Sequence, residues 1–93
     1  MAYKEIHFVS DFTDIPSAKA VMKQAQVHDA PGIGKWRLEL VDGKVRFIFV
    51  PGIALAPMLN QEKSGFYWVK MAVEATTAFK EKLPGHEFAY LLV

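Results

Sequence analysis

The chain contains no cysteine and has almost no net charge, and each absence excludes a class of function. Its 93 residues include 11 Lys and Arg against 10 Asp and Glu, which gives a formal net charge of +1. Without cysteine there is no disulfide framework, no thiolate chemistry and no zinc site built on thiolates. A balanced charge also provides no global field to attract the phosphates of nucleic acid. Only a local basic patch stays open as a nucleic-acid contact.

Long apolar runs are missing as well. Lys4, Glu5 and His7 interrupt the apolar residues near the start, so no signal-peptide core is expected. No run approaches the roughly 20 apolar residues that span a bilayer. These features predict a cytoplasmic protein without a membrane anchor. The length predicts one domain, residues 1–93, and the 52% hydrophobic composition is that of a folded globule.

The first part of the chain has the pattern of a strand followed by a helix. Residues 3–10 alternate with a period of two and are rich in β-forming side chains. Either Thr13 or Asp14 is expected to cap the helix, with Pro16 in the first turn, where a missing N–H costs nothing. The Ala-Pro-Gly-Ile-Gly sequence at 30–34 cannot continue a helix and predicts a turn.

A β-hairpin is the clearest local feature. Residues 35–41 and 44–50 both alternate, and they are joined by Asp42-Gly43, a pair that suits a type I′ turn. Counting outward from the turn predicts the pairs Leu40–Val45, Leu38–Phe47 and Trp36–Phe49 on one face and Glu39–Arg46 on the other.

The second half of the chain predicts an irregular connection, a long helix and a final strand. Residues 51–62 contain two prolines, yet they are too apolar for an ordinary solvated loop. A helix over 64–83 follows, with Pro84-Gly85 as its stop signal. Residues 86–93 are short, apolar and aromatic, which favours a strand.

This order of strand, helix, strand, strand, helix, strand resembles the ferredoxin-like sandwich. The resemblance implies an α+β fold with a four-stranded antiparallel sheet in the order 4-1-3-2 and two helices on one face. It is a resemblance of architecture alone, and that architecture carries many unrelated functions.

A surplus of apolar residues is the main functional clue. The second helix is apolar over about two-thirds of its circumference, more than the ~100° needed to face one core, and large exposed apolar patches mark interfaces. We therefore expect a non-enzymatic protein-interaction domain, adaptor-like or inhibitor-like, that binds another protein or a second copy of itself. The alternative is that the 51–59 segment folds back and covers this helix. The expected hydrophobic anchors are Ile53, Leu55, Met58, Tyr67, Trp68 and Met71.

Two other functions stay open. Dimeric α+β barrels pair their open sheet faces around a small-molecule pocket, which here would be lined by Tyr3, His7, Arg37 and Arg46. Nucleic acid would instead contact the outer face of the hairpin through Lys35, Arg37, Lys44 and Arg46. In the expected register Phe47 and Phe49 point into the core, so the aromatic platform on which RNA-recognition domains stack bases is missing.

No residue pattern predicts catalysis, a metal or a cofactor. The spacing of Gly32 and Gly34 matches neither a P-loop nor a dinucleotide motif, and a strand follows where those motifs need a helix. His7, His28 and His86 are too few and too scattered to predict a zinc site.

Overall fold

A computed structural model describes residues 3–60 and 64–93. The strands are β1 (Ile6–Ser10), β2 (Gly34–Val41), β3 (Lys44–Pro51) and β4 (Phe88–Leu92), and the two main helices are α1 (Ile15–Gln24) and α3 (Ser64–Lys82). A 3₁₀ turn, η1 (Ile53–Leu55), and a short helix, α2 (Ala56–Leu59), lie between β3 and α3. The chain is thus a small α+β domain with one sheet and three α-helices among the described residues.

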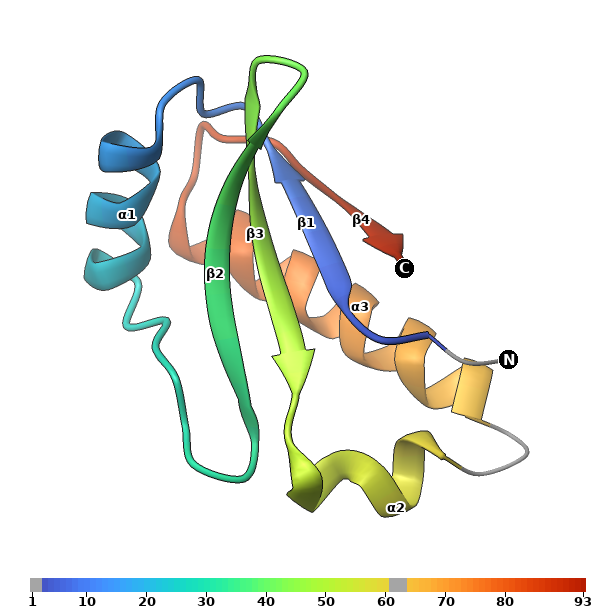
Figure 1. Cartoon of the computed structure of the whole chain (residues 1–93). Helices are drawn as coiled ribbons and strands as arrows, with labels where there is room; N and C mark the ends of the chain where they lie inside the picture. Colours follow the sequence, from blue (N-terminus) through green and yellow to red (C-terminus); the bar gives the residue numbers. More distant parts are fainter. Residues whose placement is uncertain (1–2, 61–63) are drawn as a thin grey trace.

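The four strands form one antiparallel sheet in the order β2-β3-β1-β4. Read from the other edge, this is the order 4-1-3-2 expected from the sequence. Figure 1 shows β2 and β4 at the two edges, with α3 crossing behind the sheet and α1 beside β2. Within the described residues, no helix has both the length and the apolar character needed to cross a membrane.

The hairpin register predicted from the sequence is confirmed. Trp36 pairs with Phe49, and the remaining pairs follow down to Val41 opposite Lys44. The two turn residues, Asp42 and Gly43, have φ angles of 52° and 80°. Positive φ at both positions is the type I′ geometry that matches the twist of the flanking strands.

Helix α1 begins at the second of the two expected caps. Asp14 has an extended backbone, and its Oδ1 accepts a hydrogen bond from the backbone N–H of Ser17 at 2.8 Å. Pro16 sits in the first turn. The helix ends where Gln26 adopts a left-handed φ of 60°.

The core lies between one face of the sheet and the helices α1 and α3. Phe79 of α3 is at its centre and contacts an aromatic ring from every strand. The ring centroids lie 5.3 Å away for Phe8 of β1, 5.8 Å for Trp36 of β2, 5.5 Å for Phe47 of β3 and 5.0 Å for Phe88 of β4. Ala18 and Met22 of α1 belong to the same buried cluster.

The 51–59 connection covers part of α3, as the alternative interpretation of the sequence anticipated. Leu59 is buried, and Leu55 and Met58 pack against the core. Ile53 does not follow them and stays on the surface. The connection therefore closes the core and also presents one apolar side chain outward.

Candidate functional site

The six side chains expected to anchor a partner do not share one exposed patch. Ile53 is 84% exposed. Four others are half-buried and pack against the core: Leu55, Met58, Tyr67 and Met71. Trp68 is 3% exposed. Of this set, only Ile53 offers most of its surface to another molecule.

Trp68 is a core residue, which corrects its expected role as an anchor. Its indole makes a T-shaped contact with the ring of Tyr3, with the centroids 5.9 Å apart. Tyr3 therefore lies toward α3 and not on the open sheet face where alternation placed it. The strand begins only at Ile6, so a period of two does not extend to Tyr3. The indole Nε1 of Trp68 is buried and has no hydrogen-bond partner among the described residues.

Ile53 lies between two hollows. One, of about 570 Å³, is bordered by the 29–32 turn, the start of β2 and the end of β3. The other, of about 310 Å³, is bordered by Tyr3, α2 and Trp68. Pro51, Gly52 and Ile53 border both hollows. We define the loop surface as four of the apolar residues around the first hollow: Pro31, Val50, Pro51 and Ile53.

The backbone beneath the loop surface is fixed by hydrogen bonds between two distant turns. Gly52 donates to the carbonyl of Ile33 at 2.7 Å, and Ala54 donates to the carbonyl of Gly32 at 2.9 Å. The turns approach so closely that a Cβ on Gly52 would lie 2.5 Å from the Gly32 oxygen. Since this backbone is already ordered, binding through Ile53 would carry little additional cost in chain entropy.

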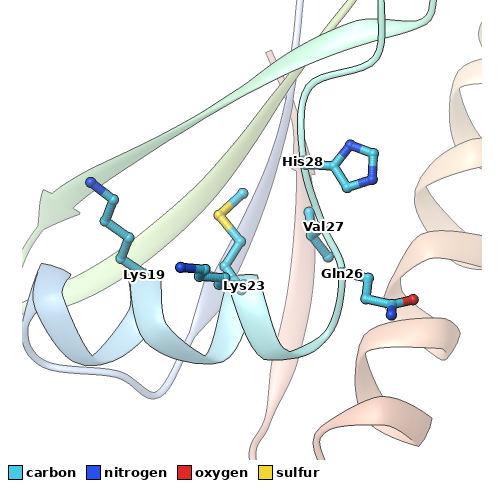
Figure 2. A pocket seen from close by; sticks show the side chains of 6 residues that line it. Lys19, Lys23, Gln26, Val27 and His28 are labelled. Atoms are coloured by element: carbon cyan, nitrogen blue, oxygen red, sulfur yellow. The ribbon is translucent and has the colours of Figure 1, made fainter.

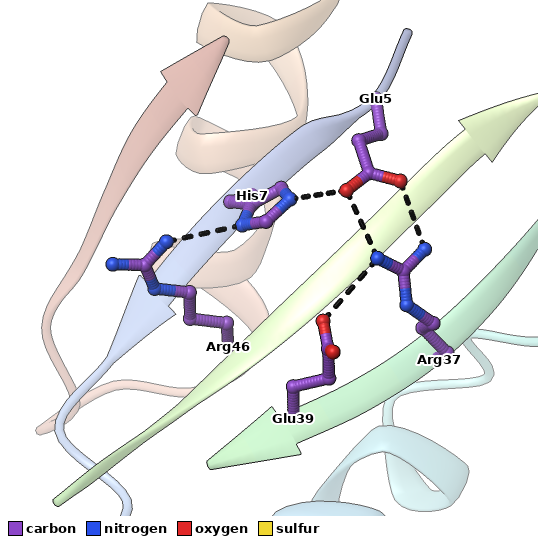
Figure 3. A network of polar contacts seen from close by, with 5 residues as sticks. All are labelled: Glu5, His7, Arg37, Glu39 and Arg46. Carbon is purple, nitrogen blue, oxygen red and sulfur yellow. Dashed lines mark hydrogen bonds and ion pairs between the residues drawn. The ribbon is translucent and has the colours of Figure 1, made fainter. Parts of the chain in front are cut away.

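A network of charged side chains covers the centre of the open sheet face (Figure 3). Arg37 donates to both carboxylate oxygens of Glu5 at 2.9 Å and to Glu39 at 3.2 Å. His7 Nε2 lies 2.6 Å from Glu5 Oε1, and Arg46 lies 3.2 Å from the other ring nitrogen of His7. His7, Arg37 and Arg46 are thus neighbours, as the sequence predicted, but they are organised around Glu5.

This network covers the open face of the sheet and leaves little room for a ligand at the centre of that face. Ile48 is fully buried although it is on the open face, opposite His7 on one side and Arg37 on the other. The hydrogen bonds from Arg37 and His7 lower the pKa of Glu5 to about 2. The Glu5 carboxylate therefore stays charged and satisfied. The alternation of residues 3–10 also predicts Glu5 on this face, but it does not predict the contact of Glu5 with Arg37 across β3.

The basic residues of the hairpin do not form a continuous free patch. Lys35 pairs with Val50 at one end of the hairpin and Lys44 pairs with Val41 at the turn, so the two lysines are far apart. Arg37, between them, is bound to Glu5 and Glu39. Since each phosphate contact requires an available cation, this arrangement weakens the interpretation as a nucleic-acid surface.

A hollow of about 740 Å³ lies along the C-terminal end of α1. Figure 2 shows Lys19 and Lys23 on the helix side and His28 on the loop that follows, with the lysine Nζ atoms directed away from the imidazole. Met22 and Val27 form its apolar wall. These polar groups do not converge on a common point, so the hollow lacks the geometry of a formed ligand site.

Asp11 and His86 are hydrogen-bonded to each other at the end of β1. His86 Nδ1 lies 2.9 Å from Asp11 Oδ1, and the backbone N–H of Glu87 donates to Oδ2 at 3.1 Å. Burial acts to raise the pKa of Asp11, but these hydrogen bonds outweigh it and hold the pKa below its usual range. The pair fixes the start of β4. Across residues 3–60 and 64–93, no three His, Asp or Glu side chains gather closely enough to hold a metal ion.

Comparison with known proteins gives no matching family model, and searches of curated proteins and of solved structures give no significant match.

Proposed function

We propose that this chain is a protein-interaction domain that binds its partner through the loop surface. The observation that carries the proposal is Ile53, a large apolar side chain that is 84% exposed and projects from a hydrogen-bonded backbone. An isolated exposed apolar residue is ordinary. Here, however, Ile53 lies beside Val50 and two prolines around a common hollow, which is the arrangement of a binding surface.

The geometry defines the chemistry of the partner. The side chain of Ile53 projects from the surface and requires an apolar pocket on the partner. The hollow bordered by Pro31, Val50 and Pro51 accepts an apolar side chain of the partner. Fully desolvated apolar anchors at the centre of an interface carry most of its binding energy. Leu55 and Met58, in the same connection as Ile53, are half-buried and pack on the core.

An adaptor-like or inhibitor-like module acts by occupying a partner's surface and needs no catalytic groups of its own. The strand order and the placement of the helices fit the ferredoxin-like sandwich, but that architecture does not select one function. The loop surface supports protein binding over a small-molecule site on the open face, because the Glu5 network fills the centre of that face.

The test is co-purification from the native host with three forms of the chain: the unchanged protein, Ile53→Ser, and Leu40→Ser. Leu40 is a matched control because it is also an exposed apolar residue, at the opposite end of the hairpin. We expect a partner protein that is retained by the unchanged chain and by Leu40→Ser and is lost with Ile53→Ser. A partner retained equally by all three forms would contradict the proposal.

A further inference from the structure

Among residues 3–60 and 64–93, no strand pairs with the outer edge of β4, so β4 is an edge strand with free backbone hydrogen-bonding groups. Val93 and Glu5 exchange both backbone hydrogen bonds, at 3.0 and 3.1 Å. In an antiparallel ladder such pairs recur at every second residue, so Leu91 and Ala89 point their N–H and C=O groups toward β1. The N–H and C=O groups of Phe88, Tyr90 and Leu92 therefore point away from the sheet, toward the open edge.

The two edges of the sheet differ in charge. Edge strand β2 carries Lys35, Arg37 and Glu39, and charged side chains are a common protection against pairing with another chain. From Phe88 to Val93 there is no charged residue, no proline and no glycine. An uncharged edge with free backbone groups is a template for another strand.

Apolar side chains flank this edge on both faces of the sheet. Leu91, paired with His7, is on the open face and is 46% exposed, and Tyr90, paired with Phe8, is on the helix face and is 37% exposed. The helix face continues onto α3. Val69 and Val73 are exposed there.

The flank of α3 that carries these two valines is the one nearer β4. Ala75 and Ala78 border a small hollow with Trp36 of β2. At about 100° per residue, Val69 and Val73 lie on the opposite side of the helix. Because β2 and β4 are the two edges of the sheet, Val69 and Val73 extend the apolar surface on the β4 side.

We propose that β4 pairs with β4 of a second copy of this chain, antiparallel and with Tyr90 on the two-fold axis. The sheets of the two copies then form one continuous eight-stranded sheet. Phe88 lies opposite Leu92 of the second copy, and every outward-pointing N–H of these strands gains an acceptor. Within Phe88–Leu92 no charged side chains meet across the new strand pair, because β4 contains none; Glu87 lies just outside it, opposite Val93 of the second copy.

A second copy fits this edge in symmetry and in area. Pairing a strand with itself is isologous and closes at two copies. The exposed parts of Phe66, Val69, Val73, Tyr90, Leu91 and Val93 amount to roughly 500 Å² if full side-chain areas are taken as about 150–250 Å². A standard interface buries about 800 Å² per partner, of which somewhat more than half is apolar.

The dimer is independent of the proposed function. The loop surface lies at the start of β2 and the end of β3 and includes none of the residues at the β4 edge. The first experiment measures mass in solution by analytical ultracentrifugation at micromolar concentrations for the unchanged chain, Tyr90→Lys and Leu40→Lys. We expect a dimer for the unchanged chain and for Leu40→Lys. With Tyr90→Lys two ammonium groups meet at the axis, and we expect at least a tenfold weaker association.

Amide hydrogen exchange and circular dichroism complete this experiment. In the dimer the amides of Phe88, Tyr90 and Leu92 are protected, and with Tyr90→Lys they exchange rapidly while the circular dichroism of the fold is kept. If Tyr90→Lys unfolds the chain, Leu91→Lys takes its place; its ammonium group would lie beside the axis, opposite Ala89 of the second copy, and we again expect weaker association and faster exchange of these amides. A monomer at all concentrations, or a dimer that keeps its association constant in the folded lysine variant, would overturn the proposal.

The register is tested with single cysteines, since the chain has none of its own. Two cysteines at position 90 would have Cα atoms about 5.5 Å apart across the axis, within the range of a disulfide. In the same register two cysteines at position 93 would be about 20 Å apart. We expect Tyr90→Cys to form a covalent dimer on oxidation and Val93→Cys to remain uncrosslinked. The reverse result would refute this pairing.

Discussion

The guanidinium of Arg37 holds the carboxylate of Glu5 in a bidentate ion pair, with both hydrogen bonds 2.9 Å long. The pair spans the full width of β3, because Arg37 belongs to β2 and Glu5 leads into β1. It lies over the buried side chain of Ile48. On the open face this ion pair covers part of the sheet, as a helix does on the other face. The protonation of Glu5 is therefore linked to folding.

The stability of the fold should depend on pH through Glu5. Its pKa falls from the ordinary value of 4.5 to about 2 on folding, chiefly through the hydrogen bonds from Arg37 and His7. The stabilisation is complete above about pH 4.5 and is lost as the pH falls toward 2. After allowance for solvent screening we expect a loss on the order of 1–2 kcal/mol. Urea unfolding measured at several pH values tests this.

Glu5→Gln should remove that acid-dependent part, because the amide cannot titrate. It should also lower the stability at neutral pH by a similar amount. Glu39→Gln is the matched control, since Glu39 makes only one exposed contact with Arg37, at 3.2 Å, and should change stability by less than about 0.5 kcal/mol. An unchanged acid transition in Glu5→Gln would assign the effect to other carboxylates.

Gly34 is required by packing. A Cβ at this position would lie 2.5 Å from two ring atoms of Phe49 and 2.6 Å from the carbonyl oxygen of Val50. We expect Gly34→Ala to destabilise the fold by about 2–3 kcal/mol, because the carbonyl belongs to the paired strand and cannot yield. Gly65→Ala, at a helical position where a Cβ would meet no described residue within 4 Å, should be neutral or stabilising by up to about 1 kcal/mol. Thermal unfolding of both variants gives the comparison.

Gly43 is required by backbone conformation alone. Its φ is 80°, and a Cβ there would meet nothing within 4 Å. Gly43→Ala should therefore cost about 1–2 kcal/mol without any steric clash. Asp42→Asn should be nearly neutral, since Asn also tolerates positive φ in a type I′ turn. Equal stability of the alanine and asparagine variants, measured by urea denaturation, would contradict this explanation.

Truncation of Trp68 should lower the stability of the fold strongly, whereas truncation of Ile53 should leave it nearly unchanged. Trp68→Ala removes a buried aromatic from the core and should cost about 3–5 kcal/mol, whereas Ile53→Ala should change stability by less than about 0.5 kcal/mol. The free energy of unfolding of each variant separates the core residue from the surface residue. A large loss from Ile53→Ala would show that this side chain stabilises the fold.

The sequence by itself determined the hairpin register and the order of the main elements. Asp42-Gly43 selects the turn, and the period of two then fixes each pair down to Trp36 and Phe49. The cap at Asp14 and Pro16 locates the start of α1 in the same way. These features depend on neighbours a few residues apart, so local patterns are sufficient to predict them.

Only the tertiary structure decided which apolar residues remain exposed. Trp68 and Ile53 are both apolar anchors by pattern, yet the first is buried against Tyr3 and the second is left outside by the folded 51–59 connection. The contact of Glu5 with Arg37 joins positions 32 residues apart. Such outcomes depend on how distant segments pack against each other, and a helical or strand period carries no information about that packing.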